Sequence, residues 1–123
     1  MANVTLKGNQ ITLAGDFPKI GDKINEFSLT ANDLSEVSLK DLSQKNIILN
    51  IFPSLDTPTC SMSVMKFNQE AANLPDCLVL CISKDLPFAQ ARFCGANNIK
   101  NVTTLSAFRN GDFARQLGID IID

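Results

Sequence analysis

One stretch near the middle of the chain constrains the fold more than any other. Residues 46–52 form an apolar run, and a helical pattern follows from Pro58 to about Leu74. Between them, Thr57 suits the N-cap, and Pro58 suits the first helical position, where a missing N–H costs nothing. The sequence therefore predicts a strand, a tight turn and a helix, which is a building unit of an α/β sheet.

Cys60 falls at the third position of this expected helix. First-turn amides lack intrahelical partners, and the positive end of the helix dipole favours an anion there. A thiol in that place is shifted towards the thiolate, its nucleophilic form. A second interpretation is a small buried hydrophobe, because Cys60 also begins an apolar stripe. The stripe continues through Val64, Phe67, Ala71 and Leu74.

The N-terminal third predicts mainly short elements. Residues 3–14 read as a hairpin with Gly8-Asn9 as its two-residue turn. Residues 27–30 are expected to form a short strand, and residues 38–42 a brief helix capped by Ser38.

Two uniformly apolar runs predict strands that are covered on both faces. They are residues 47–52, expected at the centre of the sheet, and residues 77–82. Between and after them the expected elements are a helix from Pro87 to Cys94, a strand at 102–105 and a short helix at 112–117. Asp85 or Leu86 is expected to cap the second helix, and Gly95 to end it. This alternation predicts a parallel α/β sheet.

Composition narrows the function classes. The 123 residues carry a net charge of −2 without a run of Lys or Arg, so nucleic acid and anionic membranes are poor candidate partners. No apolar stretch approaches the length of a membrane helix, and no signal peptide is visible, so the expected location is cytoplasmic. The absence of His excludes, within one chain, Cys–His and Ser–His–Asp catalysis and mixed Cys/His zinc sites.

Four cysteines without an export signal suggest thiol chemistry more than a disulfide framework. Cys81 is predicted to lie in the core, and Cys77, at the start of the same strand, to be inert. Cys94 lies in a last helical turn, where it is either inert or able to meet a distant partner after local unwinding. The cysteine spacing does not resemble a Cys₄ zinc site, and we expect no metal or cofactor.

The chain resembles a known family at specific residues. Pro53, Thr57 and Cys60 match the peroxiredoxin motif P-x-x-x-T-x-x-C. Residues 80–96 and 102–109 are similar to bacterial thiol peroxidases, which are atypical two-cysteine peroxiredoxins. The similarity runs from the N-terminal hairpin to the last residue.

This resemblance implies a thioredoxin-like fold with an N-terminal β-hairpin and an antioxidant activity. The activity would be reduction of hydrogen peroxide and organic hydroperoxides by a homodimer that thioredoxin recycles. Carried over by motif, Cys60 would be the peroxidatic cysteine, oxidised to a sulfenic acid, and Cys94 the resolving cysteine that forms a disulfide with it. Thr57 would hydrogen-bond the thiolate and the peroxide, and Pro53 would shield the site.

The chain departs from the family at its end. The family continues with a strand pair and a closing helix, so residues 1–123 are expected to be a single, C-terminally incomplete domain. Without those strands, an apolar edge beside residues 47–52 would lie open. The missing part includes the arginine that lies beside the peroxidatic thiolate in the family. None of Arg92, Arg109 or Arg115 falls in that motif, so none is given this role. The alternative functions are a redox sensor that does not turn over peroxide and a catalytically impaired fragment.

Overall fold

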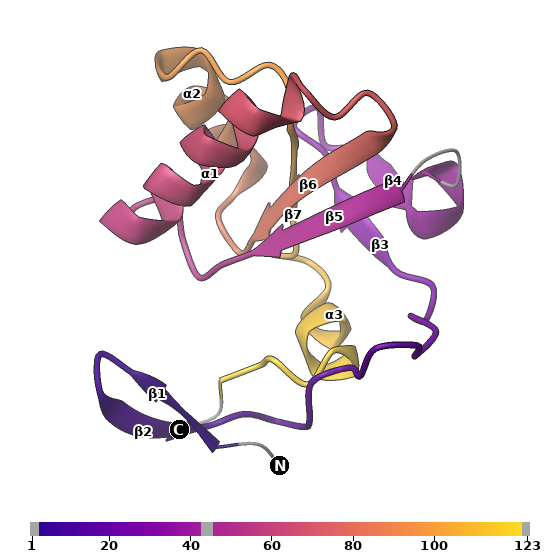
Figure 1. Ribbon diagram of the computed structural model, residues 1–123, viewed down its shortest axis with the longest axis vertical. Helices are drawn as coiled ribbons and strands as arrows, with labels where there is room; N and C mark the ends of the chain where they lie inside the picture. The colour runs from indigo at the N-terminus through magenta and orange to yellow at the C-terminus, as the bar shows by residue number, and fades with distance from the viewer. Residues whose placement is uncertain (1–2, 43–45, 122–123) are drawn as a thin grey trace. The chain divides into compact units, whose positions relative to one another are not determined.

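Figure 1 shows the computed structural model, which describes residues 3–42 and 46–121. The described chain divides into two compact units. Residues 28–109 form the larger unit, and the segments before and after them form the smaller one. Strands and helices alternate in the larger unit, which confirms the predicted α/β class.

The larger unit is built on a five-stranded sheet with the order β4-β3-β7-β6-β5. Parallel pairing joins β5, β6 and β7, whereas β3 runs antiparallel to both β4 and β7. The strands are β3 (Ser28–Thr30), β4 (Glu36–Ser38), β5 (Asn46–Ile51), β6 (Cys77–Ser83) and β7 (Thr103–Ser106). The parallel part places the carboxyl ends of β5, β6 and β7 at one edge, where α/β sheets carry their sites.

The two apolar strands differ in their burial. In β6, Val79 to Ile82 are at most 1% exposed, as predicted for a strand covered on both faces. The expectation of a central position for residues 47–52 was wrong, because β5 is the edge strand of the sheet as described and Ile51 is 37% exposed. An apolar run predicts that the side chains of a strand are at least partly buried, but it does not predict whether the strand has one neighbouring strand or two.

Two helices cover one face of this sheet (Figure 1). They are α1 (Pro58–Ala71) and α2 (Pro87–Ala96). Val64 of α1 packs with Val79 and Cys81 of β6, and partly buried side chains of both helices join the same cluster. The predicted stripe on α1 is therefore the core-facing side of the helix.

The stripe ends earlier than predicted. Helix α1 stops at Ala71, and Leu74, beyond it, is 38% exposed. The amides of Asn73 and Leu74 donate to the carbonyls three residues back, at 3.0 and 3.1 Å, which is a tightening turn instead of α-helix. Pro75 explains this end, because a residue that precedes proline is disfavoured in the helical region.

The end of α2 also differs from the prediction. Gly95 lies inside the helix, and the left-handed residue after it is Asn98, with φ of 60°. Asn97 closes the helix, since both its backbone and its side-chain nitrogen donate to the Phe93 carbonyl at 3.0 Å. Leu86, one of the two expected residues, is the N-cap.

Local turn chemistry corrects two smaller predictions. The turn between β1 (Asn3–Leu6) and β2 (Asn9–Thr12) is Lys7-Gly8, with φ of 52° and 82°, and not Gly8-Asn9. Two left-handed residues are what a type I′ hairpin turn requires. The expected helix at 38–42 is a single 3₁₀ turn, η1 (Leu39–Leu42), which follows directly on the last residue of β4.

The smaller unit contains the β1–β2 hairpin and a short helix, α3 (Gly111–Gln116), close to the predicted residues 112–117. Phe113 of α3 meets Phe27 edge to face, with ring centroids 5.2 Å apart. Gly118 ends the helix at φ of 69°, and a Cβ there would collide with the backbone of Asp16. Among the described residues, no helix has the length and apolar character needed to cross a membrane.

Candidate active site

Cys60 lies where the sequence predicts, at the third residue of α1 and immediately beyond the carboxyl end of β5. Thr57 is the N-cap, with an extended backbone (φ −92°, ψ 139°), and Pro58 opens the helix. The Cys60 side chain is half-buried. A sulfur in this place is accessible to a small solute and lies next to the positive end of a helix of 14 residues.

Thr57 does not use its side chain to cap α1. Its hydroxyl instead donates to the carbonyl of Ser54 at 2.9 Å, and its amide donates to the same carbonyl at 3.2 Å. The first-turn amides are therefore not taken by the N-cap side chain, and they are the donors that an anion at this helix end would use.

The turn before α1 is held by a carboxylate from another part of the chain. Asp85, which follows β6, accepts from the Ser54 hydroxyl at 2.7 Å through Oδ1. Its Oδ2 accepts from the Leu55 amide at 2.7 Å and from the Ser83 hydroxyl at 2.7 Å. The Ser54 hydroxyl oxygen also accepts from the Asp56 amide at 3.1 Å, so it connects the backbone of the turn to Asp85.

A fully buried glutamine extends the same network. The Gln90 side chain, on α2, donates through Nε2 to the Ser83 hydroxyl and to the Leu105 carbonyl, both at 3.0 Å. The Ser106 hydroxyl donates to the backbone carbonyl of Asp85. These hydrogen bonds thus connect the ends of β6 and β7 and the start of α2 to the turn that precedes α1 and Cys60.

Sequence reasoning missed this network. It read Asp85 only as a possible helix cap, whereas Asp85 binds residues about 30 positions earlier in the chain. A signal was present in two polar residues at the carboxyl end of a buried strand, where α/β proteins build their sites. Ser83 is the last residue of β6, and Asp85 lies two positions beyond it.

The second candidate cysteine has different surroundings. Cys94 lies in the last turn of α2, and its Sγ is 3.9 Å from the Thr104 hydroxyl. That hydroxyl donates to Asn32 at 3.0 Å, so the thiol is left to act as the donor. Burial raises the pKa of the Cys94 thiol, which keeps it protonated.

Cys81 occupies the core, as predicted, with no exposed surface. Burial raises the pKa of its thiol to about 11, and neighbouring Cys94 raises it further, whereas the Asn50 amide, 3.8 Å away, lowers it. All four cysteines are free thiols in this structure. The Cys60–Cys94 disulfide stays a prediction.

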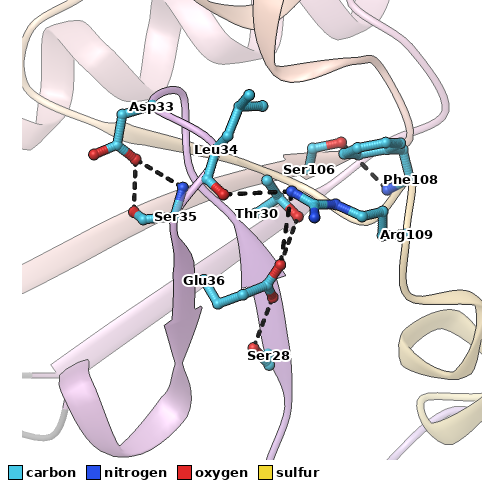
Figure 2. Close-up of polar contacts among 9 residues, drawn as sticks. All are labelled: Ser28, Thr30, Asp33, Leu34, Ser35, Glu36, Ser106, Phe108 and Arg109. Atoms are coloured by element: carbon cyan, nitrogen blue, oxygen red, sulfur yellow. Dashed lines mark hydrogen bonds and ion pairs between the residues drawn. The ribbon is translucent and has the colours of Figure 1, made fainter.

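Pro53 is the last of the predicted site residues, and Arg109 and Arg115 are two of the arginines that the family motif leaves without a role. Pro53 is exposed between β5 and α1. Figure 2 shows Arg109 directed at the β3–β4 hairpin, where it donates to the Leu34 carbonyl at 3.3 Å and lies 3.8 Å from the Glu36 carboxylate. Arg115 pairs with Asp112 at 3.5 Å, within α3. Both arginines contact residues other than Cys60, so neither is assigned the role of the family's active-site arginine.

A metal site or a pocket near the cysteines would be a further ligand-binding feature. Within the described residues, no three His, Cys, Asp or Glu side chains gather as metal ligands. A pocket in the smaller unit is lined by loop residues 16–27 and by α3, and none of the four cysteines borders it.

Comparisons with known proteins agree with this arrangement. The family described as Redoxin matches residues 19–123. A thiol peroxidase of Corynebacterium glutamicum is 52% identical over 110 residues, which cover 89% of this chain and 67% of that protein.

Solved structures show the same fold. A peroxiredoxin-like protein from Aquifex aeolicus, 40% identical, matches with a TM-score of 0.89 over 97% of this chain and 69% of its own. A thiol peroxidase from Chromobacterium violaceum, 22% identical, matches with a TM-score of 0.86 over 98% of this chain and 70% of its own, which supports the fold alone. The thioredoxin-like fold is confirmed, and the chain belongs to the redoxin family, among its bacterial thiol peroxidases.

Proposed function

We propose that this protein is a thiol peroxidase that reduces hydrogen peroxide and organic hydroperoxides through Cys60. The observation that carries the proposal is the position of Cys60 in the first turn of α1, where the N-cap side chain leaves the amides unused. Half-burial of Cys60 is compatible with the entry of a small peroxide, while partial exclusion of water strengthens the hydrogen bonds that the peroxide receives.

In the first step, the Cys60 thiolate attacks one peroxide oxygen, and the O–O bond breaks as the S–O bond forms. Sulfur gives up two electrons and becomes a sulfenic acid, and the leaving oxygen takes a proton to become water or an alcohol. First-turn amides stabilise the negative charge as it moves from sulfur to oxygen. The Thr57 hydroxyl joins them if it rotates away from the Ser54 carbonyl.

In the second step, the Cys94 thiol condenses with the sulfenic acid. An S–S bond forms, the S–O bond breaks, and water leaves. A disulfide needs Cα atoms within about 7 Å, and both cysteines lie in terminal helical turns, which open more readily than helix interiors. The dithiol of thioredoxin then reduces this disulfide by exchange and is itself oxidised.

The biological setting follows from the same proposal. The partner protein is thioredoxin, the assembly is a homodimer, and the role is antioxidant defence in the cytoplasm. Pro53, which is exposed beside the turn, limits the access of solvent to Cys60.

The test is peroxide consumption coupled to thioredoxin oxidation. We expect wild-type protein to consume peroxide and Cys60→Ser to lose at least about 10³-fold in rate, because the nucleophile is gone. Cys77→Ser is the matched control, since this half-buried cysteine opens β6 and has no role in the cycle. Oxidation of the cysteines without sustained consumption would contradict the proposal and favour a redox sensor.

A further inference from the structure

We propose that Asp85 is the positioning residue of this site, a carboxylate that fixes the turn from which Cys60 reacts. This inference deepens the proposed peroxidase function and rests on it. Asp85 touches neither the sulfur nor the place of the peroxide, and it acts through the backbone of residues 54–57.

The carboxylate is fully engaged in holding that turn. Its two oxygens accept three hydrogen bonds, each 2.7 Å long, and two of the three donors lie in the turn itself. These donors are the Ser54 hydroxyl and the Leu55 amide. Hydrogen bonds to an ionised carboxylate are shorter and roughly twice as strong as those between neutral groups.

A relay connects this anchor to the N-cap of α1. Ser54 is bound to Asp85 through its hydroxyl, and its carbonyl accepts both the amide and the hydroxyl of Thr57. Thr57 in turn begins the helix, and its carbonyl accepts from the Ser61 amide at 3.1 Å. The orientation of the first-turn amides around Cys60 therefore depends on where Asp85 holds Ser54.

The anchor is itself rigid. Asp85 is bound through Ser83 to Gln90, which is fully buried, and through its own carbonyl to Ser106 of β7. Leu55, whose own amide is anchored, is buried at 7% exposure. Such a supporting shell is what holds a reacting group within a fraction of an ångström, and a misplacement of about 1 Å can cost about 10²-fold in rate.

The test compares two rate constants of Cys60 in each variant, one with hydrogen peroxide and one with iodoacetamide. Peroxide reduction needs the aligned donors, whereas alkylation needs only an accessible thiolate. We expect Asp85→Ala to lower the peroxide rate constant about 10- to 100-fold and the alkylation rate constant by less than about threefold. Asp76→Ala, at an exposed turn before β6, is the matched control and should leave both unchanged.

Two milder variants keep the proposal testable if Asp85→Ala does not fold. Asp85→Asn retains the shape and one acceptor oxygen, and Ser54→Ala removes one of the three donors to Asp85 together with the acceptor of the Asp56 amide. Each should lower the peroxide rate constant by about three- to tenfold. A peroxide rate within twofold of wild type in the folded variants would overturn the proposal. An equal fall in both rates, or a faster peroxide reaction in Asp85→Asn, would also overturn it, since the carboxylate would then act through accessibility or charge.

Hydrogen exchange separates this inference from the proposed function. The Leu55 amide should exchange more slowly in wild type than in Asp85→Ala, whatever the activity of the protein. If wild type fails to reduce peroxide but this protection is lost in the variant, the peroxidase proposal fails and the anchoring role stands. Unchanged protection at Leu55 would overturn the anchoring role.

Discussion

Cys60 and Cys94 are chemically identical side chains at opposite ends of two helices on the same face of the sheet. Cys60 lies in the first turn of α1, beside amides that favour an anion. Cys94 lies in the last turn of α2, near carbonyls that disfavour one, with a hydroxyl beside it that already donates elsewhere. The helix end, more than the residue type, decides which thiol is suited to attack a peroxide.

The comparison also separates the two steps of the proposed cycle. The turn before Cys60 is fixed by polar bonds from Asp85, as a site prepared for one reaction geometry. Among the described residues, the Cys94 side chain makes packing contacts and one long contact to the Thr104 hydroxyl, so we expect it to leave its place at lower cost. In the second step the electrophile is the sulfenic acid on Cys60, and the Cys94 thiol loses its proton as it attacks, because the thiolate is the nucleophilic form.

Removal of Cys94 tests most sharply whether the two cysteines act in separate steps. We expect Cys94→Ser to retain the first oxidation of Cys60 within about threefold and to lose thioredoxin-coupled turnover by at least about 10³-fold, because no disulfide forms. Rapid-mixing and steady-state assays on one sample measure the two rates. Loss of the first oxidation as well would show that Cys94 is part of the attacking site.

Removal of the Thr57 hydroxyl tests whether hydrogen-bond donors around Cys60 stabilise the charge that develops during the attack on peroxide. Removing one donor from a site that stabilises developing charge typically costs 10²–10³-fold, so Thr57→Val should slow peroxide reduction by about 10- to 100-fold, given that the hydroxyl must first rotate. Thr57→Ser keeps the hydroxyl and should stay within about threefold. An unimpaired Thr57→Val enzyme would leave the amides as the only donors.

The smallest expected effect concerns the buried thiol beneath α2. The pKa of Cys81 is raised from 9.0 to about 11 in the folded protein, so its stabilising contribution is complete below about pH 9 and is lost as the pH rises through 11. Between about pH 8 and pH 10.5, the free energy of unfolding should therefore fall by about 1–2 kcal/mol from this group.

Urea unfolding at the two pH values measures this fall. Cys81→Ala should show a shallower decline than wild type, although its cavity lowers the absolute stability. Cys77→Ala serves as the comparison variant at the half-buried start of the same strand. An identical pH dependence in Cys81→Ala and wild type would contradict the assigned burial of this thiol.

Local sequence signals were sufficient to predict the start of α1. Thr57 and Pro58 occupy the N-cap and first helical positions because their backbone preferences suit those positions directly. The same logic failed at Gly95, because packing of α2 carries the helix past it and Asn97 and Asn98 provide an alternative end. A permissive residue allows a helix to stop but does not force it to do so.

Long-range relations could not be predicted in the same way. The uniform apolar character of β5 predicted a central strand, and the open edge beside it was expected from the family resemblance alone. No local sequence pattern linked Ser54 to Asp85. Such contacts depend on strand order, which brings residues about 30 positions apart to one edge of the sheet. The position of Cys60 in the first turn of a helix was therefore predictable from local pattern, whereas the polar network beside it was not.

One measurement tests the central claim most directly: the mass of the protein after one equivalent of hydrogen peroxide, with peptide mapping of any new disulfide. Attack by Cys60 followed by resolution predicts the loss of two hydrogen atoms and a cross-link between Cys60 and Cys94. An unchanged mass, or a cross-link that joins Cys94 to its neighbour Cys81 and leaves Cys60 free, would contradict the account.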